Sequence, residues 1–336
     1  MNKLFKTVAV SAVAAAMAGE AVAVEWDVAL WGKRRAFTEH VEKLAELVSA
    51  KTNGEFTLDL NYGGLAAPRE MLDGIGAGSF EMAQFCTGYH PEKTPSLTVL
   101  ELPYLGVNSL ELEVEVSNAV YSHPSVTADM ARWNATILMP SPLPQFNFAG
   151  SGPAPTNLYG LRNISIRAVG GAASAVEVLQ SEPVSIAAPN TLEALRNGTV
   201  QAAAFAPHAH MAFGIADTAT WWTTNLNPGT TNCPIAVNSE ALAALEPAHR
   251  EALLSSTKEA VDHFLQHYNQ VTMTAWRRML DERGIEEVTF NDIALEVLQD
   301  ASTGSAIAEW IEFSNARDIP AEELLGIVRT TVAEGR

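Results

Sequence analysis

Two histidines in one short segment are the most conspicuous side chains that could carry chemistry. His208 and His210 stand in Pro207-His208-Ala209-His210, and alternating residues of a strand would face the same side. Two imidazoles without a nearby carboxylate or thiolate make a poor metal site, so we expect no metal. A neutral imidazole can both donate and accept a hydrogen bond, which makes His208 a candidate ligand contact.

Motifs of catalysis and cofactor binding are missing from the sequence. Neither a Gly-x-Ser-x-Gly elbow nor a His-Glu-x-x-His helix occurs. The glycines of 74–78 have the wrong spacing for a dinucleotide fingerprint and follow a predicted helix. Cys86 has no recognisable catalytic partner, and with Cys233 it could form a disulfide or remain one of two buried thiols. We therefore expect no enzyme and no cofactor, and the cysteine pairing stays open.

Composition describes a globular chain with a strong negative charge. The 336 residues are 47% hydrophobic, and 39 acidic residues outnumber 21 basic ones for a net charge of −18. This length suggests roughly two domains. No basic stripe is present for nucleic acid, and an anionic membrane surface would repel the chain.

The amino terminus has the three parts of a secretory signal peptide. Lys3 and Lys6 precede an apolar run over 8–18, and Ala21-Val22-Ala23 gives the small-x-small cleavage pattern. The alternative is an ordinary amphipathic start. Since no later segment has about 18 uninterrupted apolar residues, we expect a periplasmic protein, cleaved after Ala23, without stable membrane insertion.

The order of predicted elements indicates an α/β fold. Strands at 24–30, 56–60 and 80–85 alternate with helices at 37–51 and 68–75, and a similar series runs from 164 to 205. Such β-α-β units form mainly parallel sheets with right-handed crossovers. Prolines between 138 and 155 interrupt regular structure there. Two lobes with a cleft between them are therefore expected, each a mainly parallel sheet flanked by helices.

A helical pattern without Pro or Gly runs over 248–283, and Gly284 ends it. At about 1.5 Å per residue it would span roughly 54 Å, enough to reach across both lobes; the alternative is two helices with a kink. We expect lobe I to comprise 24–145 with 228–250, and lobe II to comprise 146–227 with 251–336.

Several segments, in order, resemble the periplasmic solute receptors of TRAP transporters, the DctP-type substrate-binding proteins. They are Thr52-Asn53-Gly54-Glu55-Phe56, Tyr62-Gly63-Gly64-Leu65, Gly78-Ser79-Phe80-Glu81-Met82-Ala83, Leu100-Glu101-Leu102-Pro103-Tyr104-Leu105, Leu158-Tyr159-Gly160-Leu161 with Ile166-Arg167 and Gly170-Gly171, Pro183-Val184, and Ala194-Leu195-Arg196-Asn197-Gly198-Thr199-Val200. The resemblance covers most of the chain after residue 23. It implies a two-lobed receptor that binds a small organic acid and delivers it to TRAP permease subunits. A sensor subunit of the same fold is the alternative.

The resemblance gives Arg167 a role, because the matching arginine of the family binds the ligand carboxylate. A guanidinium is always charged and its planar fork fits a carboxylate bidentately. Without the resemblance, a surface arginine at the end of a strand would be the favoured interpretation of Arg167.

Departures from the family pattern suggest what kind of acid is bound. Asn190 and Leu192 replace an acidic residue and a tyrosine, and Phe205 replaces a polar residue that the family often uses for ligand. We expect the ligand to be an aromatic or apolar monocarboxylate, and the alternative is a C4-dicarboxylate or another polar carboxylate. Phe205 and Phe148 would then contact the ligand; the alternative is that both are buried in the core. The expected ligand-binding residues are Arg167, Phe205, Gln145, Asn147, Phe148, Trp31, Tyr89, His208 and Asn232.

Overall fold

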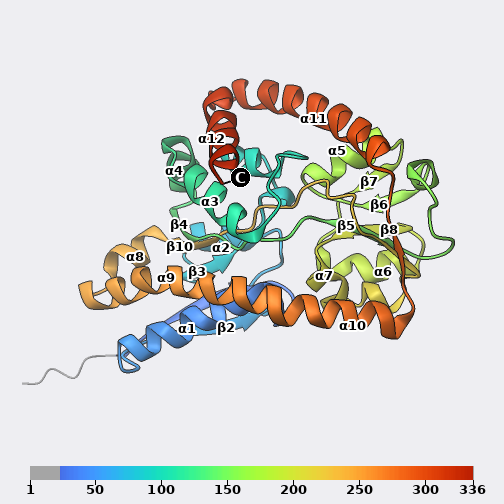
Figure 1. Ribbon diagram of the computed structural model, residues 1–336. Coiled ribbons are helices and arrows are strands. Elements are labelled where there is room, and N and C mark those ends of the chain that lie inside the picture. Colours follow the sequence, from blue (N-terminus) through green and yellow to red (C-terminus); the bar gives the residue numbers. More distant parts are fainter. Residues whose placement is uncertain (1–22, 336) are drawn as a thin grey trace, which may run out of the picture.

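The computed structural model describes residues 23–335. The expected signal peptide, apart from Ala23, lies outside the described residues. Within the described part, the chain forms two β-sheets flanked by helices (Figure 1). The α/β fold with two lobes is therefore confirmed.

The first sheet has the strand order β2-β1-β3-β10-β4. Its strands are β1 (Val24–Leu30), β2 (Phe56–Tyr62), β3 (Met82–Gln84), β4 (Ala135–Met139) and β10 (Ile235–Asn238). The pairs β1–β2 and β1–β3 are parallel, as the β-α-β pattern predicts, whereas β10 is antiparallel to both of its neighbours.

The second sheet has the order β11-β9-β5-β8-β6-β7. Its strands are β5 (Asn147–Gly150), β6 (Ser165–Arg167), β7 (Glu182–Val184), β8 (Ala202–Phe205), β9 (Trp221–Thr223) and β11 (Glu286–Val288). The one reversed strand here is β5, which is antiparallel to β8 and β9.

Each reversed strand follows a segment that crosses between the lobes. The proline-rich segment 140–146 leaves β4 and enters the second sheet as β5, and 224–234 leaves β9 and returns to the first sheet as β10. The expectation that no regular element occurs within 138–155 was wrong for β5, because its hydrogen bonds come from β8 and β9, more than 50 residues later.

Twelve α-helices lie within the described residues. They are α1 (Glu39–Lys51), α2 (Met71–Gly76), α3 (Leu110–Tyr121), α4 (Pro124–Ala131), α5 (Gly171–Val178), α6 (Thr191–Arg196), α7 (Pro207–Ala212), α8 (Ser239–Ala244), α9 (Pro247–His267), α10 (Met273–Arg283), α11 (Asp292–Asn315) and α12 (Ala321–Glu334). Buried apolar side chains of α1, among them Val41, Leu44 and Val48, pack in one cluster with β1, β2 and α9.

The long helix exists and spans both lobes (Figure 1). Its first part, α9, packs along α1, and its last part, α10, packs on α7. A π-helical turn over Tyr268–Thr272 joins the two parts. The helix is thus unbroken, and its one irregularity lies between the two lobes.

The carboxyl-terminal helices return toward the first lobe. Helix α11 contacts α5 at the second sheet, and α12 packs on α3. The expected lobe boundaries did not anticipate this contact of α12, and they stay a prediction. In residues 23–335 no helix is both long and apolar enough to cross a membrane.

Cys86 and Cys233 form a disulfide. They follow β3 and precede β10, and these two strands are antiparallel neighbours. The bond therefore fastens the returning crossover segment to the first sheet, and it decides the question that the sequence left open.

Candidate functional site

A small cavity lies between the lobes, at the ends of strands from both sheets. Its free volume is about 30 Å³, room for about two water molecules, so a ligand of the size of benzoate requires the lobes to move apart. Its lining residues are Trp31, Phe37, Cys86, Tyr89, Leu143, Phe146, Arg167, Ala188, Phe205, Ala206, His208, Ala209, Phe213, Thr231 and Cys233. In parallel α/β sheets, ligands bind beyond the carboxyl ends of the strands, and β1, β3, β6 and β8 all end here.

Arg167 is the only charged side chain that lines this cavity among the described residues. It is the last residue of β6 and only 1% exposed. Its Nε donates to the carbonyl oxygen of Ile186 at 2.9 Å, and its Nη1 donates to that of Ala204 at 3.1 Å. Burial lowers the pKa of Arg167 to about 10, an effect that the nearby Tyr89 hydroxyl partly opposes. Burial thus disfavours the charged guanidinium, and two carbonyl oxygens compensate it only in part.

Aromatic rings form the walls of the cavity. The Arg167 guanidinium carbon lies 4.0 Å from the centre of the Phe205 ring. On the first-lobe side Trp31 stacks on Phe213, with ring centres 6.1 Å apart, and Tyr89 meets Trp31 edge-on. A flat apolar molecule could therefore contact ring faces while its charged end meets Arg167.

The lobes touch each other at the cavity. The Tyr89 hydroxyl, from the first lobe, accepts a hydrogen bond from the Ala188 amide of the second lobe at 3.0 Å. Arg69 donates to the Tyr89 carbonyl and, across the cleft, to Ser185 Oγ at 2.9 Å. These contacts hold the lobes together over the cavity, so this is a closed arrangement.

The cavity brings together Arg167, Phe205, Trp31, Tyr89 and His208, five of the nine residues expected at the site. The other four lie outside its lining. Gln145 donates to the Val107 carbonyl, and Phe148 is fully buried in β5.

The two asparagines hold the crossover segments. Asn147 Nδ2 donates to Asn227 Oδ1 at 2.8 Å, and Asn147 Oδ1 accepts from the Leu226 amide. Asn232 donates its amide to Glu101 and its Nδ2 to the Tyr121 hydroxyl. These bonds position the crossover segments 140–146 and 224–234, whereas ligand contact by either residue stays a prediction.

The histidine pair lies on helix α7 and not on a strand, which corrects the expectation for Pro207-His208-Ala209-His210. Residues two apart on a helix face different directions. His208 Nδ1 therefore pairs with the Tyr268 hydroxyl at 2.9 Å, whereas His210 stacks on Trp276. Burial lowers the pKa of both imidazoles, that of His210 to about 4, so both are neutral at physiological pH. Pro207 was the available signal, since Pro is favoured in the first turn of a helix.

Arg35 is a second buried arginine that the sequence analysis missed. It is 6% exposed, and its Nη1 donates to the carbonyl oxygens of Trp31 and Lys33. Its Nε and Nη2 are buried without a hydrogen-bond partner, and its guanidinium carbon lies 4.1 Å from the centre of the Trp31 ring. Its position just after β1, at the carboxyl end of a parallel strand, could have identified it as a candidate.

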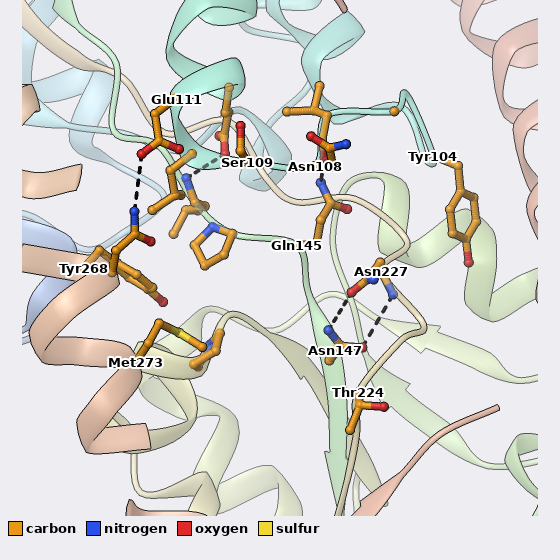
Figure 2. Close-up of a pocket in the computed structure, with 18 of the residues that line it drawn as sticks. Tyr104, Asn108, Ser109, Glu111, Gln145, Asn147, Thr224, Asn227, Tyr268 and Met273 are labelled. Carbon is orange, nitrogen blue, oxygen red and sulfur yellow. Dashed lines mark hydrogen bonds between the residues drawn. The ribbon is translucent and has the colours of Figure 1, made fainter. Parts of the chain in front are cut away.

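A larger groove opens to solvent beside the crossover segments, the start of α3 and the π-helical turn (Figure 2). Figure 2 shows Gln145, the Asn147–Asn227 pair, Glu111 and Tyr268 around it. Its acidic lining residues are Glu111, whose charge would repel an organic anion, and Glu113, whose pKa is raised well above its ordinary value by burial. The enclosed cavity at Arg167, although smaller, is therefore the better site for a carboxylate.

Comparison with known proteins identifies the family. Residues 29–307 match bacterial extracellular solute-binding proteins, family 7, also called DctP. The chain belongs to this family. It is also 23% identical over 307 residues to a protein of Comamonas testosteroni named "Outer membrane transporter protein TsaT", covering 88% of this chain and 87% of that one. Members of family 7 are solute receptors, not enzymes.

Solved structures of TRAP solute receptors have the same fold. A receptor from an unidentified marine microbe, described as specific for aromatic acids and bound to metahydroxyphenylacetate, gives a TM-score of 0.83 at 17% identity, covering 93% of this chain and 99% of that one. A Rhodoferax ferrireducens receptor with copurified benzoate gives a TM-score of 0.81 at 16% identity, covering 93% of this chain and 98% of that one. A Bordetella pertussis receptor that binds pyroglutamic acid gives a TM-score of 0.79 at 17% identity, covering 91% of this chain and 100% of that one.

Proposed function

We propose that this family 7 receptor binds an aromatic or apolar monocarboxylate between the lobes at this cavity, which would widen to hold it, with the carboxylate paired to Arg167. It would then deliver the acid to the membrane permease subunits of a TRAP transporter. Export through a signal peptide cleaved after Ala23 is part of the proposal.

The observation that carries the proposal is a buried guanidinium without a counter-ion in an aromatic cavity. No carboxylate of residues 23–335 forms an ion pair with Arg167. Burying an unpaired charge costs several kcal/mol, and an organic anion would supply the missing partner. The cavity walls offer ring faces and few polar groups, which favours a flat apolar body.

The fold relatives bind acids of more than one kind. Two are described with aromatic acids, 3-hydroxybenzoate and benzoate, whereas others are described with pyroglutamate or β-D-glucuronate. All these ligands are small carboxylates, and the aromatic walls of this cavity favour the first kind.

Binding without chemistry requires only that the lobes open and close. The two crossover segments and the π-helical turn of the long helix connect the lobes, so a hinge motion would rearrange these three places. Closure would bury the ligand, and the permease would recognise the closed form.

A second candidate ligand is a dicarboxylate, and Arg35 is the observation that favours it. Its two unpartnered donors lie beside the aromatic wall, where a second carboxylate could use them. The monocarboxylate is preferred because Arg35 is not itself part of the cavity lining.

Isothermal titration of residues 24–336 distinguishes the two candidates. Benzoate and 3-hydroxybenzoate should bind at micromolar Kd or tighter, which corresponds to about −8 kcal/mol, and succinate should bind at least 100-fold more weakly. A saturating ligand at about 100-fold its Kd should also stabilise the protein by about 2.7 kcal/mol in thermal unfolding. Tight succinate binding with no heat from the aromatic acids would refute the monocarboxylate proposal and favour the dicarboxylate.

A further inference from the structure

Three side chains of metal-ligating type meet where α1 packs on α9 in the first lobe. Glu39 is the first residue of α1, and His263 and His267 lie on α9, which packs along α1. One ligand atom from each residue lies within 4.8 Å of the other two, and all three side chains are half-buried. They are distinct from His208 and His210 and take no part in the cavity.

The neighbouring residues fix this juxtaposition. His40, next to Glu39, is fully buried and meets the Phe264 ring edge-on with ring centres 5.2 Å apart. His40 Nε2 also lies 2.7 Å from Ser141 Oγ. Because Phe264 directly follows His263, the His40–Phe264 contact sets the start of α1 against this turn of α9.

The spacing of the two histidines is that of a helical metal site. Residues four apart lie on the same helix face, and a His-x-x-x-His pair can bind one ion through both imidazoles. The His263 and His267 ring centres are 6.1 Å apart. Ligand atoms around a tetrahedral Zn²⁺ lie roughly 3.4 Å apart, given bonds of about 2.1 Å. Small rotations of the side chains would therefore close the site.

We propose that Glu39, His263 and His267 form a binding site for a divalent transition metal ion of the Zn²⁺ class. Two imidazoles and one carboxylate suit Zn²⁺, Cu²⁺ or Ni²⁺ rather than Mg²⁺ or Ca²⁺, which prefer oxygen ligands. Three protein ligands leave a position for water, so the ion would exchange with solution.

One cation already competes for the carboxylate. Arg34 Nε lies 3.5 Å from Glu39 Oε1 and 3.2 Å from Glu42 Oε1, and the Arg34 side chain is 62% exposed. An exposed ion pair of this kind contributes little free energy. A metal ion could therefore take Glu39 while Arg34 keeps its contact with Glu42.

The site would fasten α1 to the first-lobe part of the long helix. His267 is the last residue of α9, directly before the π-helical turn Tyr268–Thr272. Both α1 and α9 lie on the first sheet's side, so we expect the ion to stabilise that lobe without entering the organic-acid cavity.

The test is a ZnCl₂ titration of tag-free, EDTA-treated protein by calorimetry, with thermal unfolding measured in parallel. We expect one ion per chain and a rise in Tm. Substitution of His263→Ala or His267→Ala should weaken binding at least 100-fold, and Glu39→Gln about tenfold. Gln266→Ala, an exposed change on the same turn, should leave binding unchanged.

Two further readouts keep the result interpretable. The Tm of each variant without metal shows whether it is folded, and Co²⁺ should give visible absorption bands of a four-coordinate site that His263→Ala abolishes. The proposal is overturned if ZnCl₂ does not bind the native protein, or if both histidine variants bind it as tightly as Gln266→Ala does.

Discussion

Replacing Arg167 by Met should strongly weaken carboxylate binding while costing the unliganded protein little stability. In the complex, the ligand carboxylate would be buried without its partner, which costs about 3–5 kcal/mol. Since 1.4 kcal/mol is a tenfold change, Kd should rise between roughly 100-fold and several thousand-fold. The pKa of about 10 indicates that the buried charge itself destabilises the empty protein by about 3 kcal/mol.

Removing this buried charge should partly offset the loss of the hydrogen bonds that the guanidinium makes. The Ile186 and Ala204 carbonyl oxygens would lose a charged donor, at about 1.5–3 kcal/mol each. The Tm of the empty variant should therefore fall only by a few degrees. Calorimetry with benzoate and thermal unfolding measure the two effects separately, and Arg162→Met, at an exposed arginine five residues earlier, is the control. Benzoate affinity equal to that of the native protein would refute the reasoning.

Three other changes test separate parts of the structure. Phe205→Leu should weaken the binding of aromatic acids by about 0.5–1.5 kcal/mol, or 2- to 10-fold, because a flat ligand packs on the ring face. The binding of hexanoate, which is not flat, should not change, and calorimetry with both acids checks this. Burial raises the pKa of Glu101 to about 7, so the folded protein should lose about 3 kcal/mol as pH rises from 4.5 through 7. Urea unfolding measured across this pH range should show no such loss for Glu101→Gln. If the unfolding free energy of the variant falls with pH as steeply as that of the native protein, the prediction is wrong. The Cys86–Cys233 disulfide closes a loop of 147 residues, worth at most about 5 kcal/mol, so a Cys86→Ser/Cys233→Ser variant should unfold several degrees lower.

Elements with local signals could be predicted from the sequence. The strand Val24–Leu30 has its expected bounds, and the helix that ends at Lys51 stops before Gly54, as its apolar spacing and terminal glycine indicate. The long helix was predictable for the same reason, because an unbroken apolar pattern ended at Gly284.

Features that depend on distant partners could not be predicted. Strands β5 and β10 are only four residues long and take their direction from neighbours in the sheet they enter. Their reversal relative to those neighbours is a property of the two crossovers and not of local propensity.

The same limit applies to the site. Arg167 was a candidate through the resemblance, whereas Arg35 was missed because its burial depends on Phe213, which stacks on Trp31 from the other lobe. Residues from seven separate stretches of the chain meet in this cavity, and only the fold brings them together.

A crystal structure of the protein soaked or grown with benzoate is the most direct test of the central claim. We expect the benzoate carboxylate on the Arg167 guanidinium and its ring between Phe205 and Trp31, with the lobes closed. Benzoate bound in the open groove beside Glu111, or Arg167 turned away from it into solvent, would contradict the claim.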